Sequence, residues 1–415
     1  MVRGVAANTL RALRHRNFQL FFAGQAISLT GTWMDSVAQA WLIYRLTGSS
    51  ALLGLISFAN QIPVFLISPL AGHVADRWNR QRIVIFTQAA SMVLALTLAW
   101  LTLSGRIRIW QLFVLASLLG VVNAFDIPAR QSFLVEMVGR EDMMNAIALN
   151  SSMFNGARMV GPAIAGVLVA KIGEGWCFFA NGISYIAVIA GLLLMRLGPF
   201  VPRPALVSAW HNIYDGFQYV ARTGPIRALL LTLAVLSFAG LPYTVLMPVF
   251  AEGILHRGSQ GFGFLMGFVG LGAMCGALLL ASRSGITGLS GWVAGFGALM
   301  SISLVGFAWS HDLSLSCAIL LVAGFSMMVQ IASTNTLIQS MVPDRYRGRV
   351  MSVYSMMLIG VSPIGAMTAG FEAEHIGAPL TITIGAVVCL VSSILFALRL
   401  PAFRRAAREL VAASQ

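Results

Sequence analysis

The stretch GHVADRWNRQR, from Gly72 to Arg82, is the most charged short run in a chain with only 10% charged residues. Apolar segments flank it at 51–71 and 83–103, and each is long enough for a helix to cross a bilayer. Two spans joined by so short a loop form an antiparallel hairpin, and three arginines place its turn on the cytoplasmic side. Gly72 would allow a close approach of the helix end to a neighbour, and Asn79 tolerates the positive φ of a tight turn.

The composition is that of a polytopic membrane protein. The 415 residues are 58% hydrophobic, and the mean hydropathy is +0.83. The net charge of +13 comes from cations in short loops between apolar segments, which favours membrane orientation over nucleic-acid binding. The four cysteines fall in different apolar segments, so they predict neither a disulfide framework nor a metal site: Cys177, Cys275, Cys317 and Cys389.

Hydropathy predicts an all-α membrane protein with twelve transmembrane helices. The loops on one side of these spans hold 21 of the 27 arginines and lysines, against five on the other side, and Arg158 lies inside a span. We therefore expect both termini in the cytoplasm and an uncleaved first span in a bacterial inner membrane. The apolar segments lie near 18–44, 51–72, 83–104, 110–128, 143–170, 175–196, 226–250, 261–282, 288–309, 314–338, 350–371 and 379–399.

The two halves of the chain repeat at a constant offset. Met137 and Val138 match Met341 and Val342, and glycines further along stay in the same register. This indicates duplication of a six-span unit. The predicted domains are a first bundle at 1–196, a linker at 197–225, a second bundle at 226–399 and a cytoplasmic tail at 400–415. The linker is predicted to contain an amphipathic helix, with its apolar residues at helical spacing: Leu206, Trp210, Ile213, Phe217 and Val220.

Two ionisable residues fall deep inside predicted spans. Asp35 lies in the first span and Arg158 in the fifth, at similar depth. A charge inside hydrocarbon is costly unless it faces a partner or a cavity, so both are functional candidates. We expect both to face a central cavity, where they pair or bind substrate while a proton competes for Asp35. The alternative places Asp35 in solvent at the outer interface.

A second charged pair lies at the predicted inner end of the fourth span. Asp126 and Arg130 are expected to pair with the charges of the 72–82 loop, with Asp76 and Arg77 as partners, and so to act in gating. The alternative is solvation at the interface beside a helix stop at Pro128.

Uncharged polar residues within or near the spans are candidates for an adaptable substrate pocket. Each of them could instead form a hydrogen bond between helices. They are Gln39, Asn60, Gln61, Asn123 and Asn155.

The 72–82 loop resembles the signature loop of the major facilitator superfamily in Gly72, Ala75, Asp76, Arg77 and Arg80. It departs from that pattern with asparagine at position 79 and glutamine at 81. The resemblance implies two pseudo-symmetric six-helix bundles that rock around a midplane site, and it makes the matching residues a gating loop.

The stretch NGARMVGPAIAG, residues 155–166, resembles the Gly-Pro motif of facilitator antiporters in Gly161, Pro162 and Gly166. This favours export over import. The arginine that proton antiporters carry in the fourth span is absent, because residues 116–120 are all small or apolar.

Three further stretches resemble the bacterial branch of enterobactin exporters, macrolide efflux proteins and transmembrane secretion effectors: RNFQLFFAGQAISLTGTWM from Arg16, RLTGSS from Arg45 and NAFDIPARQ from Asn123. This resemblance implies a monomeric secondary transporter that exports hydrophobic or amphipathic molecules, drug-like or siderophore-like, in exchange for protons. A metabolite importer of the same fold, a lysolipid flippase and a non-transporting scaffold remain alternatives. Scattered histidines and the absence of a nucleotide-binding or HExxH motif predict no enzyme activity, cofactor or metal.

Overall fold

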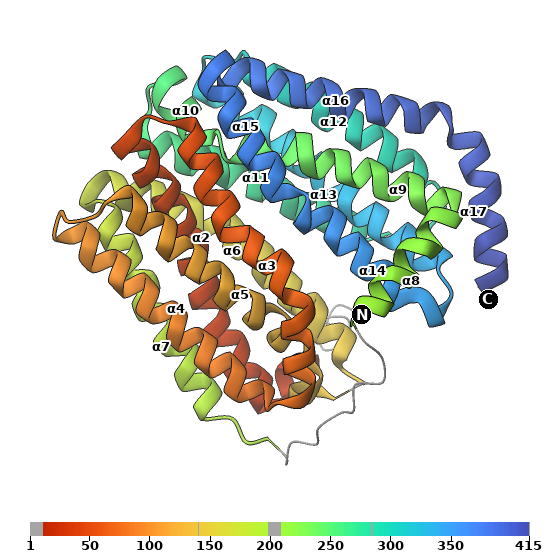
Figure 1. Ribbon diagram of the computed structural model, residues 1–415, viewed down its shortest axis with the longest axis horizontal. Helices are drawn as coiled ribbons and strands as arrows, with labels where there is room; N and C mark the ends of the chain where they lie inside the picture. Colours follow the sequence, from red (N-terminus) through yellow and green to blue (C-terminus); the bar gives the residue numbers. More distant parts are fainter. Residues whose placement is uncertain (1–10, 140, 198–208, 284, 415) are drawn as a thin grey trace, which may run out of the picture. The chain divides into compact units, whose positions relative to one another are not determined.

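The computed structural model describes residues 11–139, 141–197, 209–283 and 285–414. Within these ranges every regular element is helical, which confirms the predicted all-α class (Figure 1). Contacts divide the chain into two compact units, one of residues 1–42 and 62–206 and the other of residues 43–61 and 207–415. The tip of the first helical hairpin, residues 43–61, therefore belongs to the second unit.

The described part of the first unit is built from six long helices. Two of them, the first two along the chain, extend into the second unit through the hairpin tip at residues 43–61. Helix α4 packs along α5 and α7 (Figure 1). Phenylalanines of α2 and α5 form one buried core cluster with residues of α4, α6 and α7. The helices are α2 (Arg16–Thr47), α3 (Ser50–Arg77), α4 (Arg80–Leu103), α5 (Ile109–Val138), α6 (Met143–Ile172) and α7 (Glu174–Leu193).

The second unit combines straight helices with two interrupted spans. The straight helices are α11 (Gly258–Ala281), α12 (Leu289–Ala308), α13 (Leu313–Met341) and α16 (Ala378–Leu398). One interrupted span runs from α9 (Gly224–Val235) through a π turn η2 (Leu236–Gly240), η3 (Leu241–Thr244) and α10 (Met247–Val249) to η4 (Phe250–Ile254). The other joins α14 (Asp344–Ser355), a π turn η5 (Met356–Gly360) and α15 (Ser362–Ile376).

The element η4 is a π turn as well, and two of these three π turns, η2 and η5, meet through one side chain. The Ser237 hydroxyl in η2 donates a hydrogen bond to the Leu358 carbonyl in η5, at 2.6 Å. A π turn interrupts the regular backbone hydrogen bonds of a helix and can leave a carbonyl without a partner. A hydroxyl that donates to this carbonyl lowers the free-energy cost of the irregular turn inside a membrane.

Eleven helical segments of the described residues are long and apolar enough to cross a membrane. They coincide with eleven of the predicted spans. Helix α2, which covers the segment predicted at 18–44, has 32 residues but too many polar ones to join this set. The count of twelve spans therefore stays a prediction.

The internal repeat is visible in local structure. Gly173 and Gly377, which correspond at the repeat offset, each end one helix and begin the next, and both have a φ of 87°. Their amides donate to the carbonyls of Val169 and Ala373, which correspond at the same offset. Glycine is required at both positions because its φ is positive.

Two local expectations, at Asn79 and Gly72, were wrong, and so was the alternative interpretation that ended a helix at Pro128. Helix α5 continues through Pro128 to Val138, since a single missing amide does not end a well-packed membrane helix. Asn79 has a φ of −62° and caps α4 by accepting a hydrogen bond from the Arg82 amide at 3.1 Å. A Cβ built at Gly72 would meet no described atom within 4 Å, so no close approach is found there.

The N-terminal segment η1 (Arg11–Arg14) is held against the start of α6. Asp142 contacts His15 Nε2 at 2.8 Å and Arg11 Nε at 3.4 Å, and Asn145 accepts from the Ala12 amide. The hydrogen bond from His15 and the nearby arginines hold the pKa of Asp142 below its usual value. The carboxylate therefore keeps its charge, and this contact, at neutral pH.

The predicted linker helix is present as α8 (Ala209–Arg222), although Leu206 and the side chains of Trp210 and Ile213 lie outside the described residues. It packs on α14 through an ion pair between Asp215 and Arg349 at 2.8 Å. The predicted tail forms α17 (Leu400–Ser414), which buries Phe403 against Phe396.

Glycines bring α11 and α13 into direct backbone contact, as their spacing in the eighth predicted span indicates. A Cβ at Gly272 would overlap the Leu321 carbonyl oxygen, and one at Gly276 would lie 2.7 Å from the Phe325 carbonyl oxygen. Small residues at such crossings allow the close packing that drives helix association in membranes.

We predict that Gly272→Ala lowers the free energy of unfolding by about 1–3 kcal/mol, because the added methyl group pushes the two backbones apart. Thermal unfolding of the purified protein measures this. Gly295→Ala in α12, where a Cβ meets nothing within 4 Å, is the matched control and should be neutral or slightly stabilising. Equal losses in both variants would contradict the packing explanation.

Candidate functional site

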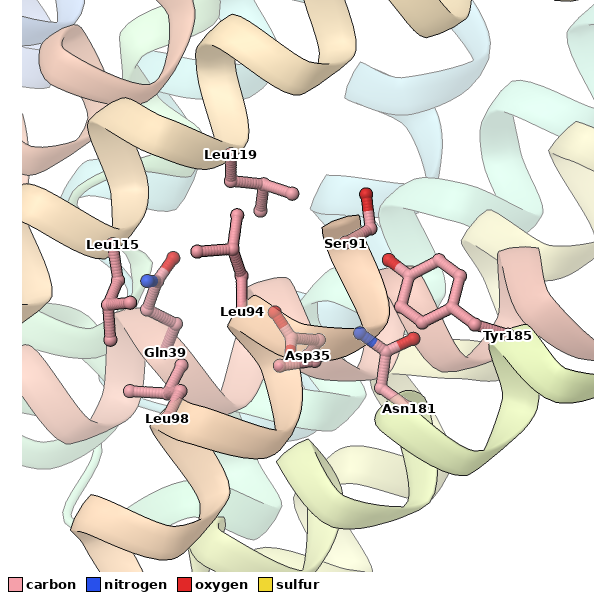
Figure 2. Close-up of a pocket in the computed structure, with 10 residues that line it drawn as sticks. Asp35, Gln39, Ser91, Leu94, Leu98, Leu115, Leu119, Asn181 and Tyr185 are labelled. Atoms are coloured by element: carbon pink, nitrogen blue, oxygen red, sulfur yellow. The ribbon is translucent and has the colours of Figure 1, made fainter. Parts of the chain in front are cut away.

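Asp35 lines a small pocket inside the first unit, among α2, α4, α5 and α7 (Figure 2). Only 7% of the residue is exposed. The Asn181 side-chain amide hydrogen-bonds to the Asp35 carboxylate, while Asp35 Oδ1 has no hydrogen-bond partner among the described residues. The pocket measures about 20 Å³, room for a water molecule. Its other lining residues are Gln39, Ser91, Leu94, Ala95, Leu98, Leu115, Leu119 and Tyr185.

Arg158 lies on another side of α2. Its guanidinium is 5.6 Å from the centre of the Trp33 ring, and Trp33 meets Phe154 edge to face at 5.6 Å. Trp33 and Asp35 are two positions apart, which separates their directions by about 200° around a helix. The structure therefore brings Arg158 to an aromatic cluster of α2 and α6, and Asp35 to the pocket behind it.

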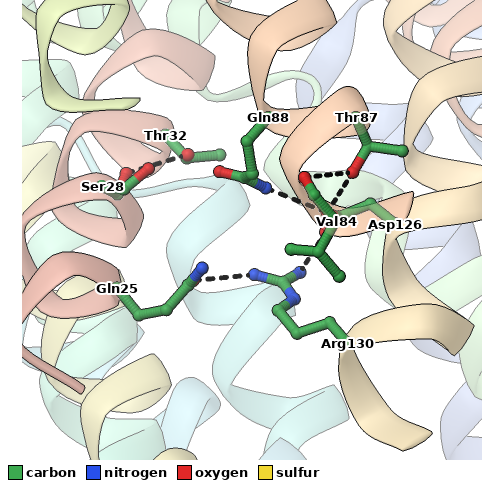
Figure 3. Close-up of polar contacts among 8 residues, drawn as sticks. All are labelled: Gln25, Ser28, Thr32, Val84, Thr87, Gln88, Asp126 and Arg130. Carbon is green, nitrogen blue, oxygen red and sulfur yellow. Dashed lines mark hydrogen bonds and ion pairs between the residues drawn. The ribbon is translucent and has the colours of Figure 1, made fainter. Parts of the chain in front are cut away.

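Asp126 is the centre of a buried polar network in the first unit (Figure 3). It pairs with Arg130 one turn later on α5, at 3.1 Å. It also accepts hydrogen bonds from Thr87 Oγ1 at 2.8 Å and Gln88 Nε2 at 2.9 Å, both on α4. Arg130 in turn donates to Gln25 Oε1 on α2 at 2.9 Å. Both Asp126 oxygens thus have partners, so this buried carboxylate is compensated by an ion pair and two hydrogen bonds.

Among the described side chains, Asp126 and Arg130 contact each other and residues of α2 and α4 rather than Arg77, and the expected pairing with Asp76 falls outside the described side chains. Because α5 extends to Val138, Asp126 lies well inside the helix rather than at its end. The contact with the loop region is instead made by Arg80, which is buried and pairs with Glu136 on the last turns of α5. Arg77 is exposed at the end of α3, and the side chain of Asp76 lies outside the described residues.

The uncharged polar candidates are dispersed. Gln39 joins Asp35 in the pocket. Gln61 donates to Ser57, and Asn155 donates to the Ser151 carbonyl, so both bond within their own helices. Asn60 and Asn123 are half-buried on α3 and α5.

The Gly-Pro motif brings α6 against α2. A Cβ at Gly161 would lie 2.7 Å from the Trp33 Cβ and 2.9 Å from the Thr30 carbonyl oxygen. Pro162 and Gly166 are buried in the same helix. In the second unit, a Cβ at Gly365, the counterpart of Gly161 in the repeat, would overlap the Phe238 carbonyl of η2. The motif is therefore a packing contact that the duplication preserved.

The tip of the α2–α3 hairpin is fastened to α15 within the second unit. The Glu374 carboxylate accepts hydrogen bonds from the hydroxyls of Ser49 and Ser50 at 3.1 and 3.0 Å, and from the Ala51 amide at 3.2 Å. These groups form the start of α3, where a negative charge is favourable. A Cβ at Gly370 would lie 2.7 Å from the Ser50 carbonyl oxygen, so the backbones touch beside this cap.

Several members of these clusters cannot be recognised from the sequence. Thr87, Gln88, Ser91 and Asn181 are ordinary polar residues in apolar helices, and only their position opposite an acid makes them notable. Glu374 lies just beyond the span predicted at 350–371, and its contacts with Ser49 and Ser50 become visible only in the structure.

We predict that Asp126→Asn lowers the free energy of unfolding by about 3 kcal/mol, because Arg130 loses its buried counter-charge. In a double-mutant cycle with Arg130→Gln, the double variant should lose about 1–3 kcal/mol less than the sum of the single losses. Thermal unfolding provides the values, and strictly additive losses would show that the two residues do not interact.

Comparison with known proteins agrees with this architecture. A family model described as transmembrane secretion effector matches residues 7–413. A staphyloferrin A transporter of Staphylococcus aureus is 26% identical over 91% of this chain and 94% of its own length. The multidrug efflux pump Tap of Mycolicibacterium fortuitum is 24% identical over 84% of this chain and 87% of its own. The enterobactin exporter EntS of Escherichia coli is 24% identical over 86% and 85%.

A crystal structure of the peptide transporter POT superposes with a TM-score of 0.74 at 12% identity, covering 94% of this chain and 96% of that one. This likeness concerns the fold. The candidate spans and the bacterial relatives indicate a multi-pass protein of a bacterial inner membrane. The match over nearly the whole chain shows that the protein belongs to the transmembrane secretion effector family of major facilitator superfamily transporters.

Proposed function

We propose that this transporter exports a hydrophobic or amphipathic small molecule in exchange for protons, and that Asp35 is the proton-binding group. The observation that carries this proposal is a buried carboxylate in the middle of α2 with one oxygen that lacks a hydrogen-bond partner among the described residues. A charge so placed is costly, and protonation removes that cost. Proton uptake and release at Asp35 would therefore change the stability of its surroundings.

Asp126 is the less suitable proton carrier. Its carboxylate is held by Arg130, Thr87 and Gln88, and protonation would give up the ion pair. Within the described part of the chain Asp35 has only Asn181, so the neutral and ionised forms differ less in the contacts they make.

The aromatic cluster of Trp33, Phe154 and Arg158 is the proposed cargo contact in the first unit. Phe154 is 44% exposed, and the guanidinium over Trp33 adds a cation to the aromatic faces. Such a surface suits amphipathic molecules with an acidic or aromatic group. The names of the relatives, a staphyloferrin A transporter, an enterobactin exporter and a multidrug pump, support a cargo of this class and the outward direction.

We further propose that the chain works as a monomer with both termini in the cytoplasm. In this proposal α2 also crosses the membrane, which brings the number of spans from eleven to twelve. The excess of cations in the loops on one side supports this orientation. In this scheme Asp35 and Trp33 face different directions from one helix, so proton and cargo would act on α2 without sharing a site.

The first test is proton flux driven by transport in proteoliposomes over a panel of lipophilic compounds and siderophores. We expect wild-type protein to move protons against cargo and Asp35→Asn to lose this coupling, because an amide cannot take up the proton. Glu141→Gln, a change at an exposed acid outside the pocket, is the matched control. Coupled transport that survives in Asp35→Asn would refute the role of Asp35. Absence of proton movement with every compound would favour a uniporter or a lysolipid flippase.

The Glu374 contact should hold the tip of the α2–α3 hairpin in place. We predict that Glu374→Gln speeds amide hydrogen exchange in residues 49–52 by roughly two- to fivefold, because the charged cap of α3 is lost. Glu372→Gln on the same helix is the control, since that exposed side chain lies outside the contact. Unchanged exchange in Glu374→Gln would mean that the cap does not hold the tip.

A further inference from the structure

The Asp35 pocket contains more oxygen than a proton site needs. Binding of a proton requires only the carboxylate itself. Three more side chains that line the pocket each carry an oxygen atom, Gln39, Ser91 and Tyr185, while Asn181 turns its amide nitrogen toward Asp35 (Figure 2). They come from three helices of the same unit, which is how proteins assemble a cage of oxygen ligands for a hard cation.

A pocket occurs at corresponding positions in both units, but only the pocket of the first unit contains an acid. At the repeat offset, Asp35 and Gln39 correspond to Ala239 and Tyr243, and both of these line a second pocket, in the second unit. That pocket measures about 10 Å³, half the volume of the first, and its lining residues include no acid. The helical arrangement therefore leaves a gap in both units, and only the first is enlarged and supplied with a carboxylate.

The charge of the ligand follows from the single acid. One carboxylate neutralises a monovalent cation, whereas a divalent ion would leave a net positive charge in a low-dielectric interior. Among the described residues no group of three His, Cys, Asp or Glu side chains could hold a metal ion, so a transition-metal site is not indicated here. The hard oxygen donors and a volume near that of one water suit Na⁺.

We propose that the pocket binds Na⁺ at Asp35, in competition with the proton. The coupling role of this exchange rests on the proposed function, but the binding itself does not. The unpartnered Asp35 Oδ1 is the proposed anchoring ligand, and the side-chain oxygens of Gln39, Ser91 and Tyr185 are the proposed further ligands.

Competition gives the binding a defined pH dependence. The other titratable groups near Asp35 are Tyr185 and Cys177 of α7, and both are ordinarily neutral at pH 7, while α4 and α5 present Ser91 and leucines to the pocket. Asp126, farther along α5, is paired with Arg130. Na⁺ should therefore bind more tightly as pH rises, until Asp35 is fully ionised.

The test is the thermal unfolding of the purified full chain in detergent, titrated with NaCl against choline chloride at constant ionic strength. We expect NaCl to stabilise the wild type at pH 8.5. The Na⁺ midpoint should increase by about tenfold for each pH unit below the pKa of the carboxylate. Asp35→Asn should abolish the response, Ser91→Ala should raise the midpoint roughly tenfold by removing one ligand, and Glu141→Gln should respond like the wild type.

Equal stabilisation by NaCl and choline chloride in the wild type would overturn the Na⁺ site, as would a Na⁺ response that persists in Asp35→Asn. Should Asp35→Asn fail to fold, Ser91→Ala decides, and an unchanged midpoint there counts against the site. Loss of the Na⁺ site in a protein whose proton flux still requires Asp35 leaves the proposed function intact. A Na⁺ response at Asp35 without proton flux supports the site and overturns proton antiport.

Discussion

A charge inside a membrane protein must be neutralised or solvated, and this requirement organises the first unit. Asp126 meets it fully, because Arg130 supplies the counter-charge and Thr87 and Gln88 supply hydrogen bonds. Asp35 meets it only in part, with Asn181 as its partner and a small pocket beside it. Several kcal/mol separate a satisfied buried acid from an unsatisfied one, so the two carboxylates cannot have the same role. The first holds helices together, and the second is suited to binding a mobile cation.

Much of the fold is predictable because hydropathy and loop charge follow directly from the solvent. Eleven spans, the linker helix and the glycine crossings appear where the sequence indicates them. The helix ends were less predictable. The fourth span was predicted near 110–128 with Asp126 at its inner end, yet α5 continues through Pro128 to Val138, and this moves Asp126 from the end of the helix into its interior.

The candidate site shows where prediction from sequence fails. The depth of Asp35 can be counted along the helix, but its direction depends on which side of α2 meets α4 and α7. Polar residues occur on several sides of α2, so its apolar pattern does not determine its rotation. The expected meeting of Asp35 and Arg158 depended on that rotation, and the structure turns Trp33 rather than Asp35 toward Arg158. Partners such as Asn181 lie far along the chain, on α7, and become visible only when the helices pack.

The duplication explains why these roles could separate. The glycine contacts at Gly161 and Gly365 kept the same packing in both units. At the repeat offset, Asp126 and Arg130 correspond to Gln330 and Thr334, both buried and uncharged, and Asp35 corresponds to Ala239.

The second unit carries π turns in its two interrupted spans, at η2 and η4 in one and at η5 in the other. Irregular turns of this kind are common at functional sites, and they let a helix change shape at low cost. The first unit carries the buried charges, while the second is neutral at the corresponding positions and irregular in its backbone. In the function we propose, a cation acts on the first unit through Asp35, whereas the interrupted helices allow the second unit to change shape without titration of a buried acid.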